Sequence, residues 1–162
     1  MYTDTNIIGE RGEMLATALL MTGEVFSARL LGGKVEAFDV YAEVYDTSCP
    51  YPLLLQVKTT TMSDRYNNSS IKTPVDDVTI RRLAAKPIPT YVAGFDMIDN
   101  VMYLAPVFSG AEQYPSIPLN HKLDLNHPGI AVAVLQQLKK DVIRYYDSIN
   151  IKNNKSTYVS LL

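Results

Sequence analysis

The residues best suited to chemistry in this sequence are two acids, a glutamine and a lysine within its first 58 positions. Glu13 lies in a segment with helical spacing, Asp39 lies in a strand-like segment, and Gln56 and Lys58 follow a run of leucines. Burying a charged group costs several kcal/mol unless the group is paired or bound to a metal. The aspartate among apolar strand residues and the lysine after the leucines therefore need a reason.

Hydrolysis of a phosphodiester would supply that reason. Oxygen ligands hold Mg²⁺ with several retained waters, and the ion polarises a phosphate and lowers the pKa of a bound water. In this interpretation Asp39 binds the metal, Glu13 binds it directly or through water, and Gln56 and the Val57 carbonyl offer further oxygens. Lys58 acts as the catalytic base or stabilises developing charge. Mn²⁺ would substitute for Mg²⁺.

A helix and two strands must position the first two of these residues. Apolar residues after Asn6 recur at helical spacing, which predicts a helix that ends near Gly23. Strands are predicted over Val25 to Leu31 and over Val35 to Tyr45. The second strand alternates strictly, so that Asp39 points away from its apolar neighbours.

The glutamine and the lysine belong to the next predicted strand, Leu53 to Thr59. Its continuous apolar run is typical of a central strand that is buried on both faces. Leu54, Gln56 and Lys58 share one face by the period of two. The polar segment Thr60 to Thr73 that follows is predicted to be a mobile loop.

The remainder of the chain again alternates helices and strands. Thr73-Pro74 with two following acids predicts the start of a helix that runs through Leu83 or Ala84. The later predictions are strands over Ile88 to Phe95 and Asn100 to Val107, a loop over Phe108 to Asn126, and a helix from His127-Pro128 to Tyr146 or Asp147. The whole order predicts one α/β domain over residues 1–162.

Composition and charge exclude several classes of protein. The chain is 47% hydrophobic with a net charge of −2, which is typical of a globular domain and not of one coated in basic residues. Its single cysteine, Cys49, cannot form an internal disulfide, and His121 and His127 lack the spacing of zinc ligands. No signal peptide or membrane-spanning run is visible, so we expect a reducing cytoplasm and no membrane.

The ordered motifs resemble those of a known superfamily. Gly9-Glu10-Arg11-Gly12-Glu13, then Phe38-Asp39, then Leu55-Gln56-Val57-Lys58-Thr59 are similar to the PD-(D/E)XK nucleases, and most similar to small bacterial domains with a Gln-Val-Lys core that often accompany phage-defence genes. The likeness covers about residues 6–107. It implies a restriction-endonuclease-like fold, with a central mixed β-sheet flanked by helices, and Mg²⁺-dependent cleavage of DNA. Ala37-Phe38 stands where a Pro or Gly usually precedes this Asp, and Gln56 replaces the acid of the namesake motif.

The resemblance also implies partners. DNA is the expected substrate, and partner defence proteins are further expected partners of the chain. A homodimer is also consistent with the resemblance, because many folds of this kind cut duplexes as dimers. Basic residues after the motif are candidates for contacts with DNA phosphates, and Tyr66 for stacking on a base. The basic residues are Arg65, Lys72, Arg81, Arg82 and Lys86.

Alternatives stay open for each residue. Glu10 competes with Glu13 for the ligand role, Glu13 could be a solvated helix residue, and Asp39 could end in a surface salt bridge. Gln56 and Lys58 could end an edge strand, where lysine discourages aggregation. For the whole chain, the alternatives are a catalytically inactive nuclease-like fold that serves as a binding or regulatory module, and a structural protein that assembles through its C-terminal helix.

Overall fold

The computed structural model describes residues 4–32, 38–61, 65–66, 70–71, 75–107, 117–118 and 122–159, with side chains described in 4–32, 38–61, 75–107 and 122–149. In chain order the elements are α1 (Asp4–Leu20), the 3-10 turn η1 (Thr22–Glu24), β1 (Phe26–Leu30), β2 (Val40–Val44), β3 (Pro52–Thr60), β4 (Arg65–Tyr66), β5 (Ser70–Ile71), α2 (Asp77–Ala84), β6 (Thr90–Asp96), β7 (Val101–Pro106), β8 (Ile117–Pro118), β9 (Lys122–Asp124) and α3 (Pro128–Val159).

A mixed sheet forms the centre of the molecule. Within the described ranges, six strands pair in the order β1-β2-β3-β6-β7-β9, and β4, β5 and β8 form a small second sheet. β3 and β6 are parallel, whereas the other neighbours in the large sheet are antiparallel. Parallel neighbours need a crossover connection, and the segment with α2 supplies it. The predicted α/β architecture, a mixed sheet flanked by helices, is confirmed.

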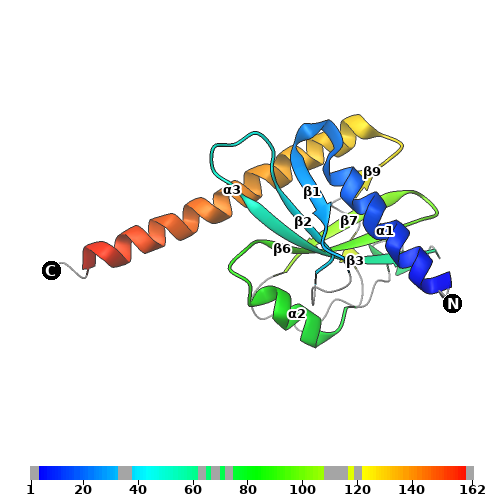
Figure 1. Cartoon of the computed structure of the whole chain (residues 1–162), viewed down its shortest axis with the longest axis horizontal. Coiled ribbons are helices and arrows are strands. Elements are labelled where there is room, and N and C mark those ends of the chain that lie inside the picture. The colour runs from blue at the N-terminus through cyan, green and yellow to red at the C-terminus, as the bar shows by residue number, and fades with distance from the viewer. Residues whose placement is uncertain are drawn as a thin grey trace.

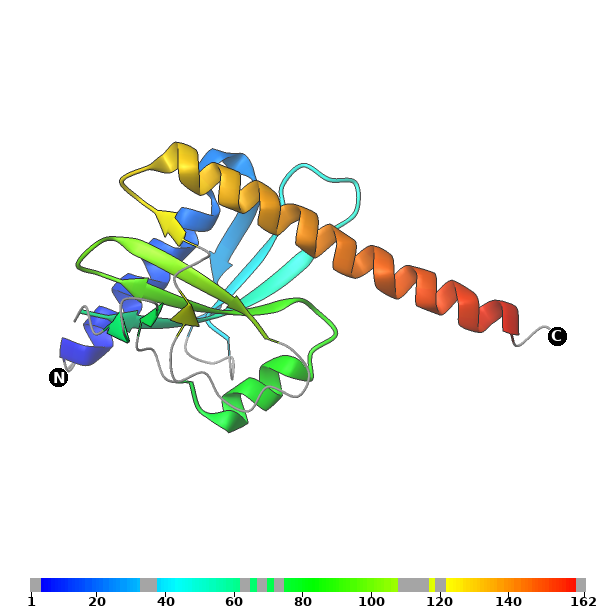
Figure 2. The same cartoon turned by 180° about the vertical axis from the view of Figure 1, so that it is seen from behind.

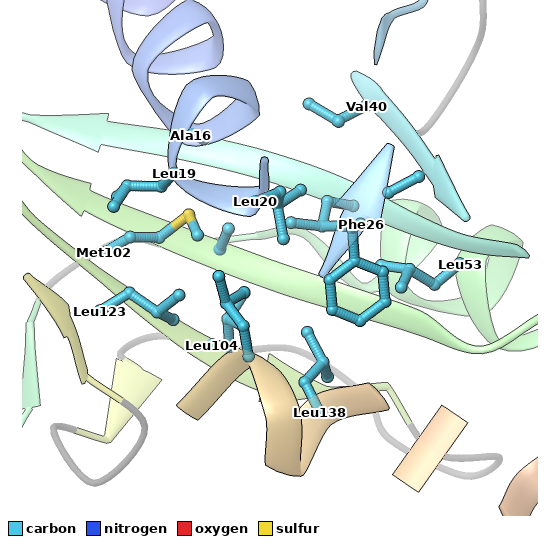
Figure 3. Close-up of a cluster of buried hydrophobic side chains, with 14 of the residues drawn as sticks. Ala16, Leu19, Leu20, Phe26, Val40, Leu53, Met102, Leu104, Leu123 and Leu138 are labelled. Atoms are coloured by element: carbon cyan, nitrogen blue, oxygen red, sulfur yellow. The ribbon is translucent and has the colours of Figure 1, made fainter. Parts of the chain in front are cut away.

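Helices cover the two faces of the sheet unequally. α1 and α3 lie on one side and α2 on the other (Figures 1 and 2). The larger core cluster lies under α1 and α3, where Leu19 and Leu20 of α1 and Leu138 of α3 meet the apolar residues of the strands (Figure 3). A smaller cluster lies under α2 and includes Ile80, Leu83 and Val92. Burial on both faces explains the continuous apolar run of β3.

The position of β3 decides one of the alternatives. It is the third strand of six, and Leu53 to Val57 are buried throughout. Gln56 and Lys58 therefore do not belong to an edge strand, and that interpretation is wrong. Because Leu53, Leu55 and Val57 belong to the cluster under α1 and α3, Gln56 and Lys58 face the side of α2.

Several predicted boundaries are wrong. β2 begins at Val40, and 33–37 lie outside the described residues. α2 begins at Asp77 with Asp76 as its cap, not at Thr73-Pro74, because the Asp76 carboxylate accepts the Thr79 N–H. The two predicted loops contain the short strands β4, β5, β8 and β9. α3 continues past Asp147 to Val159.

None of the helices in the described ranges combines the length and the hydropathy needed to span a bilayer.

Candidate functional site

The candidate site lies where β2 and β3 separate, a place that we call the fork. In the described residues, pairing between these strands ends at Val40 opposite Leu55, whereas β3 continues to Thr60. On its other side β3 stays paired with β6 along its whole remaining length. The backbone of β3 beyond Leu55 is thus held from one side and open to side chains from the other. Gln56 and Lys58 both lie in this stretch.

Asp39 occupies the fork because its backbone is fixed on both sides. Its N–H donates to the Leu55 carbonyl at 2.8 Å, and its carbonyl accepts the Leu31 N–H at 2.9 Å. Its carboxylate Oδ2 then accepts the Val57 N–H at 2.7 Å and the Gln56 Nε2–H at 2.5 Å. The carboxylate therefore takes the place of a strand carbonyl on β3 and closes the open side of the ladder.

Glu13 reaches the same region because α1 lies unusually close to β3. A Cβ on Gly12 would stand only 1.9 Å from Thr59 Oγ1 and 2.8 Å from Thr59 Cβ. Only a glycine permits this contact between a helix and a strand. The residue after the contact on α1 is Glu13, and the residue before the contact on β3 is Lys58. The close approach thus places Glu13 beside the end of β3, where the charges of Asp39 and Lys58 act on it.

The charges at the fork interact with one another. Burial raises the pKa of the Asp39 carboxyl above 3.8, against the opposing effects of the Val57 N–H, Lys58 and Gln56. Burial also raises the pKa of Glu13 above 4.5, with further increases from the charges of Asp39 and Glu10 and a decrease from Lys58. Burial therefore disfavours the charged forms of both acids, and Lys58 offsets this only in part.

Two oxygen atoms at the fork remain available to a ligand. Among the described residues, neither Asp39 Oδ1 nor Gln56 Oε1 accepts a hydrogen bond, and Lys58 makes no salt bridge. The same part of the chain contains no group of three or more His, Cys, Asp or Glu side chains that could hold a metal ion. A metal at the fork would therefore take two carboxylates and complete its shell with amide or carbonyl oxygens and water.

The structure brings Glu13, Asp39, Gln56 and Lys58 together, and the Val57 backbone lies among them. Glu10 lies one helical turn from Glu13, is exposed, and acts on the site through its charge. Asp39 does not end in a surface salt bridge, because its partners are the N–H groups of β3.

The basic residues that were candidates for DNA contacts differ from one another in their partners and surroundings. Arg81 forms a salt bridge with Asp77 at 2.9 Å on the exposed side of α2, and Arg82 is also engaged. The Lys86 ammonium lies 5.8 Å from the centre of the Phe38 ring. Lys72 lies outside the described residues, as do the side chains of Arg65 and Tyr66.

Other titratable residues lie away from the fork or have partners of their own. Glu43 accepts the Tyr41 hydroxyl at 3.0 Å. His127 Nδ1 lies 3.0 Å from Asp124 Oδ2 at the start of α3, and Cys49 is exposed. His121 lies outside the described residues. None of the described residues among these joins Glu13 and Asp39.

Sequence reasoning gave no structural role to two residues at or near the site. Gly12 was noted only as part of the motif that resembles the nucleases, whereas its close contact with Thr59 sets the position of α1. Asp76 was assigned only as an acid at the start of a helix, yet the charge of Lys58 helps to lower the pKa of Asp76, after the larger effect of its bonds to Thr79. α2 therefore begins near Lys58, which sequence spacing does not reveal.

No protein-family model matches the chain, and a search of curated proteins finds no match either.

Proposed function

We propose that the protein is a Mg²⁺-dependent nuclease that hydrolyses phosphodiester bonds of DNA at the fork. The observation that carries this proposal is the hydrogen bond that the Asp39 carboxylate accepts from the Val57 N–H, at a place where the charges of Glu13 and Lys58 also interact with one another. Two acids and a lysine held together at the open side of a strand suit metal-assisted hydrolysis better than they suit packing.

The donor set fits a magnesium or manganese ion. Carboxylate and amide oxygens are the ligands that these ions prefer, and both acids carry raised pKa values that a nearby cation would lower again. Asp39 Oδ1, the Glu13 carboxylate and Gln56 Oε1 would hold the ion. When bound, the ion would polarise the phosphate and lower the pKa of a coordinated water.

The side chains of the chain itself have distinct tasks in this proposal. Gln56 and the Val57 N–H orient the Asp39 carboxylate, so that one oxygen is fixed and the other is directed away. Lys58 orients the attacking water or stabilises charge on the phosphate. Arg81 and Arg82 on α2, which begins near Lys58, contact phosphates further along the strand.

The test is cleavage of plasmid DNA and single-stranded DNA with Mg²⁺ or Mn²⁺. Asp39→Asn keeps an oxygen for the Val57 N–H and removes the charge, so it should fold and should lose at least about 100-fold in rate. Lys58→Ala should lose a similar factor. The matched controls are Asp147→Asn and Lys140→Ala, two exposed residues of α3. If both site variants cleave DNA at the wild-type rate, the residues of the fork take no part in the reaction.

A second function is favoured by the hydrogen bonds of Asp39. Its Oδ2 is already satisfied by two donors, and Gln56 stands where the resembling family has an acid. A nuclease-like fold that has lost catalysis and serves as a binding or regulatory module would keep such a site as a structural support. Calorimetric titration with Mn²⁺ separates the two functions, since a catalytic site binds the ion and a purely structural one does not.

We further propose that the protein works in the cytoplasm, beside partner defence proteins. The exposed thiol of Cys49 suits a reducing compartment. Fractionation of cells that express the chain, followed by crosslinking to DNA and to neighbouring proteins, tests both statements.

A further inference from the structure

The sheet face that carries the fork continues over β1 and β2, outside the core cluster under α2. In the described part of the chain, the buried strand residues of that cluster belong to β6 and β7. Phe26 of β1 and Val40 and Val44 of β2 point to the opposite side of the sheet, into the cluster under α1 and α3. The alternate residues of β1 and β2 therefore share the face of the fork, and they include Arg29 and Tyr41.

Arg29 and Tyr41 form a stacked pair on this face. The two residues are directly opposite each other in the pairing of β1 with β2. The Arg29 guanidinium lies 4.6 Å from the centre of the Tyr41 ring, within the range of a cation–π contact. The Tyr41 hydroxyl donates to Glu43 Oε2 at 3.0 Å, which restricts rotation of the ring. A guanidinium that is already stacked on a restrained ring loses less freedom when it binds a ligand.

The donor groups of Arg29 remain available to a ligand. Among the described residues Arg29 forms no salt bridge, and its guanidinium N–H groups donate no hydrogen bond to them. Stacking uses the flat side of the guanidinium, and its edge stays open to water because the residue is exposed. That edge presents N–H groups in a geometry that matches two oxygens of a phosphate.

Arg29 lies close to the fork, on the side of Asp39 that is away from Lys58. The Leu31 N–H donates to the Asp39 carbonyl, so Arg29 and Tyr41 lie two residues, or about 7 Å, further along the two strands. A polyanion that approaches the two acids of the fork is repelled unless cations flank them. Lys58 and the start of α2 flank Asp39 on one side, and Arg29 flanks it on the other.

We propose that Arg29 binds a phosphate of the DNA strand that is cut at the fork, and that Tyr41 is the positioning residue that holds Arg29. This inference rests on the proposed function, because it takes the scissile phosphodiester to lie at Asp39. The strand then crosses the sheet diagonally, from α2 over the fork to β1. Arg29 contacts the sugar–phosphate backbone beside the scissile bond, so its effect is independent of base sequence. It strengthens the binding of substrate and transition state alike.

Two measurements on the full chain test the proposal. The first is binding of a fluorescent single-stranded DNA without added metal, over a range of salt concentrations. Arg29→Gln should raise Kd about tenfold. It should also lower the slope of log Kd against log salt by about 0.7, the value for one phosphate contact on a single strand. The second is cleavage with Mg²⁺, in which Arg29→Gln should raise KM by a similar factor and leave kcat within about twofold.

Three further variants separate a phosphate contact from a structural role. Arg144→Gln is the matched control, because Arg144 is an exposed arginine of α3, on the opposite side of the sheet, and it should leave Kd, the salt slope and KM unchanged. Tyr41→Leu removes the ring and should raise KM about threefold, whereas Tyr41→Phe keeps the ring and should keep the wild-type KM. Support of the β1–β2 pair alone would change the melting temperature and leave the salt slope as it is.

The outcomes distinguish this inference from the proposed function. If Asp39→Asn abolishes cleavage while Arg29→Gln keeps the KM and the salt slope of the Arg144→Gln control, the nuclease function stands and this inference is overturned. If the chain cuts no DNA but Arg29→Gln still lowers the salt slope, the nuclease function fails and the phosphate contact of Arg29 is supported. A wild-type chain that binds no DNA overturns both.

Discussion

Replacing Gly12 with alanine tests whether the approach of α1 to β3 sets the geometry of the fork. The added Cβ would stand 1.9 Å from Thr59 Oγ1 and 2.8 Å from both Thr59 Cβ and Cγ2. Rotation of the Thr59 side chain can remove the contacts with Oγ1 and Cγ2, but Thr59 Cβ is fixed to the strand. α1 must therefore move away by at least about 0.6 Å, the difference between 2.8 Å and the 3.4 Å of ordinary contact.

That movement carries Glu13 away from Asp39 and Lys58. A misplacement of about 1 Å can cost on the order of 100-fold in rate, so we expect Gly12→Ala to lose between about 10- and 100-fold in cleavage and to bind Mn²⁺ more weakly. Thermal unfolding should shift only modestly, because the gain in helix propensity of about 1 kcal/mol offsets part of an overpacking cost of about 1–3 kcal/mol.

Gly9→Ala is the matched control in the same helix. A Cβ on Gly9 meets nothing within 4 Å, so this variant should gain up to about 1 kcal/mol of stability and keep its activity. Thr59→Gly removes the three colliding atoms, and the double variant with Gly12→Ala should recover Mn²⁺ affinity. The reasoning is refuted if Gly12→Ala binds Mn²⁺ and cuts DNA as the wild type does, or if Gly9→Ala is equally impaired.

Three further predictions concern stability and pH. The pKa of Glu13 is raised in the folded chain by burial first and by Asp39 and Glu10 next, so stability falls as pH rises through the window just above 4.5. In metal-free buffer, the melting temperature of Glu13→Gln should therefore lie above that of the wild type at neutral pH, and this difference should vanish below that window. A difference between variant and wild type that is the same at both pH values contradicts this. Tyr146→Phe removes the 2.7 Å hydrogen bond to Pro52 and should cost about 1 kcal/mol in urea unfolding, against no change for the exposed Tyr45→Phe. Asp76→Ala removes the cap of α2 and should lower the free energy of unfolding by about 1 kcal/mol, whereas Asp76→Asn should retain most of the stability that the cap contributes. Equal losses of stability in the two variants would mean that the charge of Asp76, and not capping, matters.

Local patterns in the sequence were sufficient for the elements that carry the site. The leucine run before Gln56 predicted a central strand, and β3 is central, because a strand covered on both faces must be apolar throughout. The alternation around Asp39 predicted a half-buried strand, and Val40, Ala42 and Val44 are buried in β2. Element boundaries were less accurate. The cap of α2 was placed at Thr73, whereas Asp76 is the residue whose carboxylate reaches the free N–H groups of the helix.

The sequence by itself determined which residues could do chemistry, because acids and a lysine inside apolar segments stand out without any knowledge of the fold. Only the tertiary structure decided that they meet. Asp39 lies at the fork because β2 leaves β3 after Leu55, and Glu13 joins it because Gly12 lets α1 touch Thr59. Contacts between remote segments are set by the packing of the whole chain, so they appear only when it is folded.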